Sequence, residues 1–234
     1  CAKNAVFSGG KDGKDEPKMA FTVHAVMPGV WHIVDCMGVC MTLLEGENAA
    51  MLVDTGYGIE DVADFMRHMT DLPLTVFLTH NHHDHAMGAR CFPETYMLEA
   101  DMADWDIFTN DEMRRRVLTQ AIGKNLTVDE KTFLAGEIPL PKVMKPGVID
   151  LGGLTAEIIE APGHTPGSAV LYVPERKLLL SGDDWNPCTW LFFPQALGLR
   201  EYRSNMRGIQ QLPFEKVLCP HREALYDRWM SDAF

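Results

Sequence analysis

The sequence predicts an α+β protein in which two β-sheets pack face to face and helices cover their outer faces, giving four αββα layers. Short apolar segments of strand length, punctuated by Gly and Pro, occur in both halves of the chain. In each half a run of strands is followed by a helix and a further strand, so the same order appears twice. This order favours two sheets that share one core and carry their helices outside.

The strands expected in the first half cover residues 21–27, 30–35, 40–45, 50–54 and 74–79. A helix is expected over residues 58–69, because Val62, Phe65, Met66 and Met69 recur at helical spacing. Residues 99–135 look mainly helical and contain no residue that looks catalytic, so we expect a helical insertion at about residues 99–145. The strands expected in the second half cover residues 148–151, 154–160, 169–173, 177–181 and 216–219, with a helix over 200–211.

The length of 234 residues fits one domain with one sizeable core. Residues 1–18 contain a polar Gly-, Lys- and Asp-rich stretch that predicts a flexible tail, so we assign the domain to residues 19–234. The chain starts at Cys1 without a Met. That start is compatible with the lipidated cysteine of a bacterial lipoprotein and equally with a trimmed boundary.

The formal net charge of −12 disfavours nucleic acid as a partner, because an acidic surface repels phosphate backbones. No apolar run reaches the roughly 20 residues that cross a bilayer. The six cysteines contain no CxxC pair, which indicates free thiols in a reducing compartment and therefore a cytoplasmic location. A small-molecule substrate is the expected partner, and a homodimer is compatible with the sequence.

Four potential metal ligands, His80, His82, Asp84 and His85, lie within six residues at the end of a predicted buried strand. Alternate residues of an extended chain point the same way, so His80 and His82 can converge on one ion. Asp84 and His85 follow the turn and can face a second ion. Imidazole and carboxylate together suit zinc, and also manganese or iron.

This HxHxDH segment resembles the first motif of the metallo-β-lactamase superfamily. Four further segments resemble the rest of its pattern in the same order: 53–56 (Val-Asp-Thr-Gly), 161–168 (Ala-Pro-Gly-His-Thr-Pro-Gly-Ser), 181–183 (Ser-Gly-Asp) and 219–221 (Cys-Pro-His). The resemblance covers about residues 21–225 and implies the four-layer αββα sandwich of glyoxalase II-like metallo-hydrolases. It also implies that His80, His82 and His164 hold one ion, that Asp84, His85 and His221 hold a second, and that Asp183 bridges both.

The resemblance further implies a hydrolase in which two divalent metal ions share a nucleophilic hydroxide, with Asp84 and Asp183 as catalytic carboxylates. Asp54 is expected to orient a ligand imidazole by hydrogen bonding. The scissile bond would be an ester, thioester, lactone or phosphodiester. Asn186 stands where lactonases of the family carry a tyrosine, which disfavours the lactone. His83 is expected to be exposed, and His24, His32 and His68 to be structural or surface residues.

Two other functions stay open for this ligand pattern. Sulfur dioxygenases of the same superfamily use a single iron, so one iron per chain would favour an oxidoreductase. The third reading is a non-catalytic metal-binding module. A further expectation concerns the apolar segment after Asp183, which predicts a wall or lid over the metals made by Trp185, Trp190, Phe192 and Phe193. Ordinary core or dimer packing is the alternative role of that segment.

Overall fold

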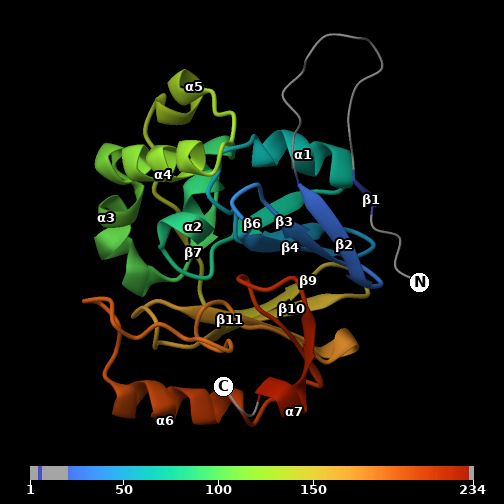
Figure 1. Cartoon of the computed structure of the whole chain (residues 1–234). Helices are drawn as coiled ribbons and strands as arrows, with labels where there is room; N and C mark the ends of the chain where they lie inside the picture. Colours follow the sequence, from blue (N-terminus) through green and yellow to red (C-terminus); the bar gives the residue numbers. More distant parts are fainter. Residues whose placement is uncertain (1–4, 7–20, 232–234) are drawn as a thin grey trace.

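The computed structural model describes residues 5–6 and 21–231 and has the four-layer arrangement that the sequence predicts (Figure 1). Two β-sheets lie face to face, with helices above one sheet and below the other. The α+β fold class is therefore confirmed. Cys1 and nearly all of the predicted tail lie outside the described residues. Ala5–Val6 (β1) are the exception, since they pair antiparallel with the strand that starts at Thr22.

The first sheet runs in sequence order from β1 to β8. Its further strands are β2 (Thr22–Met27), β3 (Val30–Val34), β4 (Cys40–Glu45), β5 (Ala50–Val53), β6 (Leu74–Phe77), β7 (Tyr96–Met97) and β8 (Lys142–Val143). The strands up to β5 pair antiparallel, whereas β5 to β8 pair in parallel. The loops that follow the parallel strands β5 and β6 therefore leave from the same edge of this sheet, which brings the segment after residue 53 to the segment after residue 77.

The second sheet has the order β14-β13-β12-β11-β10-β9. Its strands are β9 (Gly147–Asp150), β10 (Thr155–Glu160), β11 (Ala169–Val173), β12 (Leu178–Leu180), β13 (Lys216–Leu218) and β14 (Leu225–Asp227). Only β12 and β13 pair in parallel, so the segments after residues 180 and 218 also leave from one edge.

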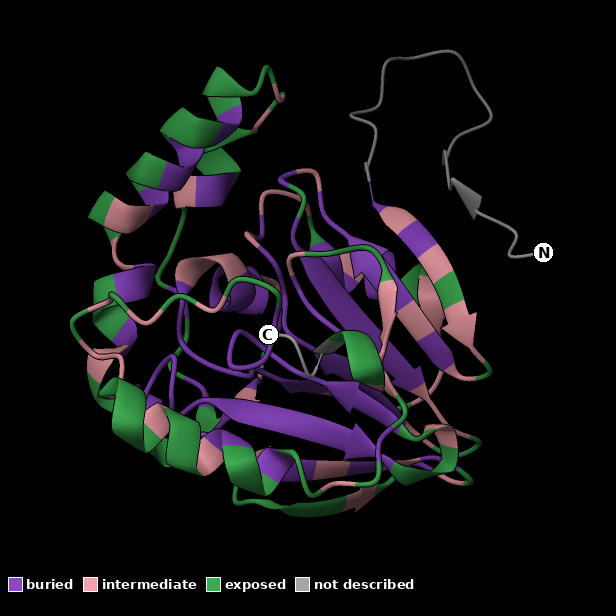
Figure 2. Cartoon of the chain, turned by 60° about the horizontal axis from the view of Figure 1, so that its bottom comes forward, coloured by how far each residue is buried: buried purple, intermediate pink, exposed green. Residues whose placement is uncertain are grey.

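Helices cover both outer faces. α1 (Val62–Met69) packs on the first sheet through Val62, Phe65 and Met66. α6 (Leu199–Ile209) packs on the second sheet through Met206 and Ile209 and exposes its other face, as Figure 2 shows. The remaining helical segments are α2 (His83–Ala86), η1 (Met87–Cys91), η2 (Glu99–Asp104), α3 (Trp105–Thr109), α4 (Asp111–Gly123), α5 (Glu130–Leu134), η3 (Pro174–Arg176) and α7 (Arg228–Ser231).

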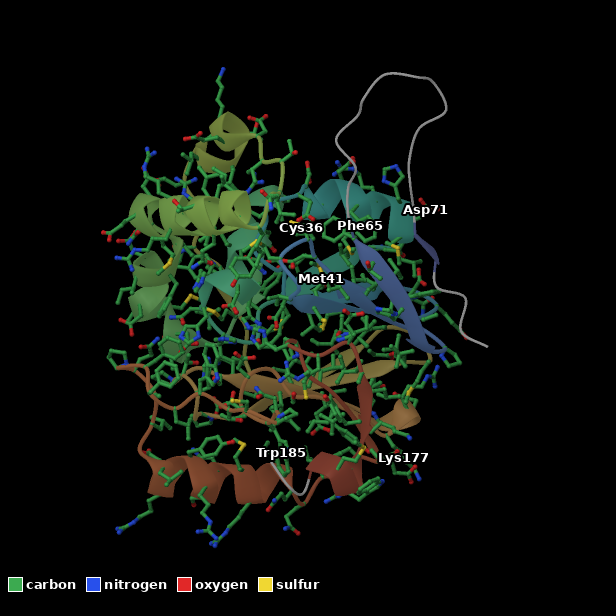
Figure 3. All side chains as sticks on the ribbon, viewed as in Figure 1. Cys36, Met41, Phe65, Asp71, Lys177 and Trp185 are labelled. Carbon is green, nitrogen blue, oxygen red and sulfur yellow. The ribbon has the colours of Figure 1, made fainter. Side chains whose placement is uncertain are left out.

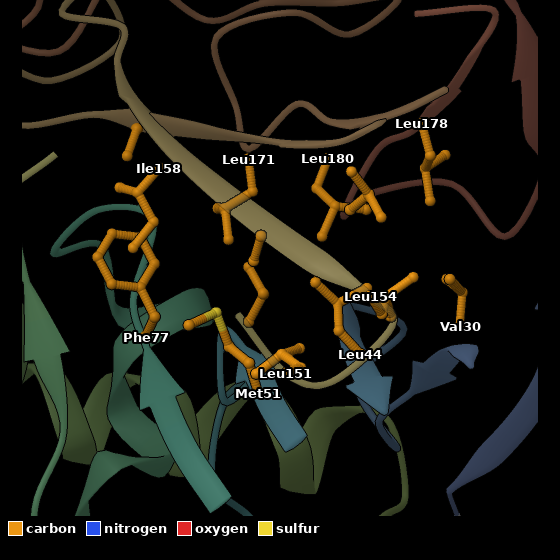
Figure 4. Packing of buried hydrophobic residues seen from close by; sticks show 14 of the residues in the cluster. Val30, Leu44, Met51, Phe77, Leu151, Leu154, Ile158, Leu171, Leu178 and Leu180 are labelled. Carbon is orange, nitrogen blue, oxygen red and sulfur yellow. The ribbon is translucent and has the colours of Figure 1, made fainter. Parts of the chain in front are cut away.

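The main core lies between the two sheets (Figure 4). Val30, Leu44, Met51 and Phe77 come from the first sheet and meet residues of the second, among them Leu171. All five side chains are fully buried. Burial of a Leu or Phe side chain stabilises a fold by about 1.5–3 kcal/mol. This core therefore holds the two sheets, and the loops at their edges, in a fixed relation.

Several boundaries differ from the sequence-based expectations. α1 begins at Val62 rather than at residue 58, because Asp61 caps it by accepting a hydrogen bond from the Asp64 N–H over 2.9 Å. Gly58 has a φ of 63° and cannot continue into a helix. The insertion expected at 99–145 is helical only as far as Leu134, and β8 near its end extends the first sheet. The short strands β7 and β14 and the helix α7 were not expected.

Two expectations about the whole chain can be compared with the described part of it. In residues 5–6 and 21–231, no helix combines the length and the apolar character needed to cross a membrane. The five cysteines of the described part, Cys36, Cys40, Cys91, Cys188 and Cys219, are free thiols, as expected.

Candidate metal centre

The predicted ligands come together at the edges of the two sheets, on the loops that follow the strands. His80, His82, Asp84 and His85 follow β6, and His164 follows β10. Asp183 follows β12, and His221 follows β13. Three groups of ligand atoms each lie within 4.8 Å of one another: His80 with His82 and His164, His80 with His85 and Asp183, and Asp84 with His85 and His221. Residues as far apart in the sequence as His80 and His221, which are 141 positions apart, thus share one site.

Asp183 lies between the other ligands. Its Oδ1 is 3.6 Å from His85 Nε2, and its Oδ2 is 3.5 Å from His164 Nε2. The same Oδ2 is 3.2 Å from His221 Nε2. The same nitrogen of His221 is also 3.5 Å from Asp84 Oδ2. One carboxylate therefore reaches the neighbourhoods of both predicted ion positions.

Unpartnered buried atoms test whether these residues fit a metal. His80 Nε2, His85 Nε2 and Asp183 Oδ1 are buried without a hydrogen-bond partner, and all three point into the cluster. A buried polar atom without a partner costs about 1–3 kcal/mol. Nitrogen and carboxylate donors with free lone pairs at such spacing are the donor set that zinc, iron or manganese requires. The residues fit the implied metals.

The electrostatics of the cluster agree with that fit. Burial lowers the pKa of His80 well below its usual value, and burial together with the His164 imidazole lowers the pKa of His82 to about 3. These two rings are therefore neutral at pH 7, which is the form that binds a metal. Burial alone would raise the pKa of Asp183, but His85 and His221 hold it well below its usual range. The site therefore combines neutral imidazoles at His80 and His82 with an ionised Asp183. Against the lowering by burial, Asp183 and Asp84 raise the pKa of His85 well above its usual value.

The nitrogens of the ligand rings that face away from the cluster have defined partners. His85 Nδ1 lies 2.9 Å from Asp54 Oδ2. His80 Nδ1 lies 3.0 Å from Thr79 Oγ1, which itself donates to the Asp54 carboxylate. His164 Nδ1 lies 2.7 Å from the carbonyl oxygen of Trp190. These contacts fix ring orientations, and Asp54 contacts the ring of His85, one of the predicted ligands.

Asp101, a residue that sequence reasoning missed, ties the insertion to two ligand loops. Its Oδ2 accepts from the Thr165 hydroxyl over 2.7 Å and from the Asn81 N–H over 3.3 Å. Its Oδ1 accepts from the Gly167 N–H over 2.6 Å. A Cβ on Gly167 would lie 2.6 Å from Asp101, so glycine permits this approach. Asn81 lies between His80 and His82, and Thr165 follows His164. No local pattern around Asp101 signals this role.

The aromatic side chains that follow Asp183 lie in two different places, which the sequence did not predict. Phe193 lies beside the site, with its ring centroid 4.7 Å from that of His82. Trp190 and Phe192 stack next to it and are 52% and 69% exposed. Phe108 of α3, also missed, completes this side at 4.5 Å from His82. The described residues therefore form an aromatic rim on one side of the cluster.

The placement of Trp185 in that wall is wrong. Its side chain is buried and lies edge-on to Phe214 with centroids 6.0 Å apart. Together with Met206 it belongs to the cluster between the second sheet and α6, where Figure 3 labels it. Residues 182–184 form a turn, and Asp183 and Trp185, two residues apart, face different layers.

The other histidines have structural contacts. His83 is half-buried rather than exposed, because its ring lies edge-on to Tyr57 with centroids 5.5 Å apart. His32 is buried, with contacts of 3.1 Å to Thr42 Oγ1 and to the Arg222 carbonyl oxygen. His24 pairs with Glu223, and His68 contacts the Asp64 carbonyl oxygen on α1.

Comparisons with known proteins indicate one superfamily and its fold. The model of the metallo-beta-lactamase superfamily matches residues 34–221. The chain is 26% identical over 202 residues to acyl-coenzyme A thioesterase MBLAC2 of Gallus gallus, covering 76% of this chain and 70% of that protein. It is 24% identical over 173 residues to a linear primary-alkylsulfatase of Pseudomonas sp. (strain ATCC 19151), covering 60% of this chain and 32% of that one. Its fold is similar to the mono-zinc form of the metallo-beta-lactamase FIM-1 from Pseudomonas aeruginosa, with a TM-score of 0.65 at 16% identity over 91% of this chain and 92% of that one.

Proposed function

This chain belongs to the metallo-beta-lactamase superfamily and is a metallo-hydrolase, and from that premise we propose that it uses two divalent metal ions to hydrolyse small-molecule ester or thioester bonds. The observation that carries the proposal is the three overlapping donor groups, in which the Asp183 carboxylate lies within 3.6 Å of His85, His164 and His221 and buried donor atoms are left unpartnered. In the proposed assignment one ion is held by His80, His82 and His164, the other by Asp84, His85 and His221, and both by Asp183. Zinc is the expected metal, and the same ligands accept manganese or iron.

Bound there, two divalent ions would acidify a water molecule to a pKa near 7 and polarise the carbonyl group that this water attacks. The chain itself supplies the geometry. Asp54 holds the ring of His85 through its 2.9 Å contact with Nδ1. Asp84 would accept a hydrogen bond from the attacking water. That bond would orient the lone pair of the water oxygen toward the substrate. Phe193 and Phe108 shield His82 from solvent on the side of the rim.

An apolar acyl group is the substrate part that this rim favours. Trp190, Phe192 and Phe193 stack on one another with centroids 4.9–6.3 Å apart, and two of them are mostly exposed. Exposed aromatic side chains beside a polar cluster are typical of a ligand site that binds an apolar group next to its reacting bond. The similarity to an acyl-coenzyme A thioesterase supports the same bond type, whereas the alkylsulfatase supports an apolar chain on a different ester.

The metal requirement is tested first by plasma mass spectrometry on protein purified without chelators. We expect about two zinc or manganese ions per chain, falling in the Asp183→Ala variant and unchanged in Asp71→Asn, whose side chain is exposed. A protein without metal would refute the proposal. A single iron per chain would favour the sulfur dioxygenase alternative instead.

The bond type is tested with matched series of ester and thioester substrates whose acyl chains increase in length. Hydrolysis should rise with chain length, stop on chelation and be lost in Asp183→Ala. Metal-loaded protein that cleaves none of these, nor lactone or phosphodiester substrates, would support the non-catalytic metal-binding alternative.

A further inference from the structure

His82 differs from the other ligand rings in where its outer nitrogen finds a partner. His82 Nδ1 lies 2.8 Å from His164 Nε2, so this nitrogen faces the metal cluster. The other nitrogen, Nε2, lies 2.8 Å from the side-chain amide of Gln195. Thr79, Asp54 and the Trp190 carbonyl contact the outer nitrogens of His80, His85 and His164, as described above. Gln195 is 113 positions from His82 in the sequence and lies on the segment that also carries Trp190.

We infer that Gln195 is a positioning residue that fixes the ring and the proton of His82 for metal binding. The inference rests on the proposed function, because it needs His82 Nδ1 as a ligand. A neutral imidazole carries one proton, and a ligand nitrogen must be free of it. His82 Nε2 must then carry the proton and donate it to an acceptor.

The amide of Gln195 can be that acceptor. The structure has the amide nitrogen nearest to His82, but a half-turn of the amide exchanges nitrogen and oxygen at the same place. With Oε1 turned inward, Gln195 accepts the Nε2–H of His82 over the same 2.8 Å. The ring then presents an unprotonated Nδ1 to the cluster, as the metal requires.

The backbone holds Gln195 in place on both sides. The Ala196 N–H donates to the Phe193 carbonyl over 3.0 Å, and the Leu197 N–H donates to the Gly163 carbonyl over 2.8 Å. Gly163 directly precedes the ligand His164. The segment that carries Gln195 is therefore hydrogen-bonded to the His164 loop at Leu197. At its other end, the carbonyl oxygen of Trp190 contacts His164 Nδ1. One segment thus supports two of the three ligands of the first cluster and none of the second.

The test is zinc titration against a chromophoric chelator, which resolves the two binding constants without any assay of activity. Gln195→Met keeps the length of the side chain and removes the amide. We expect it to weaken one of the two sites by roughly 10- to 100-fold, the range for loss of a hydrogen-bond partner behind a metal ligand. The other constant should not change. Gln195→Glu keeps an acceptor and should restore the wild-type constant.

The matched control is Gln120→Met, an exposed glutamine on α4, which should change neither constant. The inference is overturned if folded Gln195→Met binds both ions as the wild type does, or if Gln195→Glu is as weak as Gln195→Met. Should Gln195→Met not fold, as judged by circular dichroism, a weakened site in folded Gln195→Glu would also overturn it. Wild-type protein that takes up no zinc would refute the proposed function itself, so the two failures are distinguishable.

Discussion

The carboxylate of Asp54 receives His85 Nδ1 at 2.9 Å and, through both of its oxygens, the hydroxyl of Thr79. Asp54 directly follows β5 and has a φ of 65°, a left-handed conformation that Asp adopts more readily than most residues. Because β5 and β6 pair in parallel, this carboxylate lies beside the loop that carries the first four ligands. One buried side chain in the turn after β5 thus holds the ring of His85 in its orientation.

Asp54→Asn should weaken metal binding without removing a ligand. The Asn amide carries no charge. It also turns its NH₂ group toward His85 Nδ1 or the Thr79 hydroxyl, the two groups that donate hydrogen bonds to the Asp54 carboxylate. We expect zinc affinity at the site of His85 to fall by roughly 10- to 100-fold, measured by chelator competition. Asp71→Asn is the control, since Asp71 is exposed and lies at the far end of α1 (Figure 3). Unchanged affinity in folded Asp54→Asn would show that the contact does not matter for binding.

Asp101→Asn should destabilise the fold and loosen the first ligand cluster together. The carboxylate accepts hydrogen bonds from three buried donors, on Gly167, Thr165 and Asn81, and an amide group would oppose at least one of them. We expect a loss of about 1–3 kcal/mol in the free energy of unfolding, measured by urea denaturation. Asp106→Asn, at an exposed position of α3, should leave stability unchanged. Equal stability of the two variants would contradict the proposed tie between the insertion and the ligand loops.

Trp190→Ala should change substrate binding, whereas Trp185→Ala should change stability. Trp190 belongs to the exposed rim, so its removal should raise KM for a long-chain acyl substrate and leave stability nearly unchanged. Trp185 is buried under α6, so its removal should cost about 3–5 kcal/mol of stability and leave KM of the folded protein unchanged. Thermal unfolding and steady-state kinetics on both variants decide the matter. A KM that responds to Trp185 but not to Trp190 would contradict the assignment of the rim.

His32 should make the fold sensitive to acid. Burial lowers the pKa of His32 from 6.5 to about 4 in the folded chain. The unfolded chain therefore binds a proton between these pH values that the folded chain does not, and the free energy of unfolding decreases as the pH falls from 6.5 to 4. A shift of this size corresponds to about 3 kcal/mol.

His32→Gln keeps a donor for the Arg222 carbonyl and removes the titrating group. The variant should lose less stability than the wild type between pH 6.5 and pH 4, measured by denaturation at each pH. Parallel pH profiles for the two proteins would show that His32 does not titrate in this range.

The order of strands and helices could be predicted from the sequence, because alternation and helical spacing of apolar residues are local signals. The ligand set could be proposed from the spacing of His80, His82, Asp84 and His85 and from the resemblance of four further segments. Short elements such as β7, β8 and β14 could not be predicted. Their two or three residues carry no periodicity, and they exist because a neighbouring strand offers an edge.

By itself, the sequence determined that two sheets with outer helices form and that one strand ends in a dense group of metal-binding side chains. Only the tertiary structure decided which distant residues support that group. Asp101, Phe108 and Gln195 carry no local signal, because each acts through a contact with a segment far away in the chain. It also decided that Trp185 faces α6 while Phe193 faces His82. The physical reason is that the spacing of apolar residues along the chain determines which face of a helix or strand is apolar. Which residues that face contacts depends on how the layers pack in the folded protein.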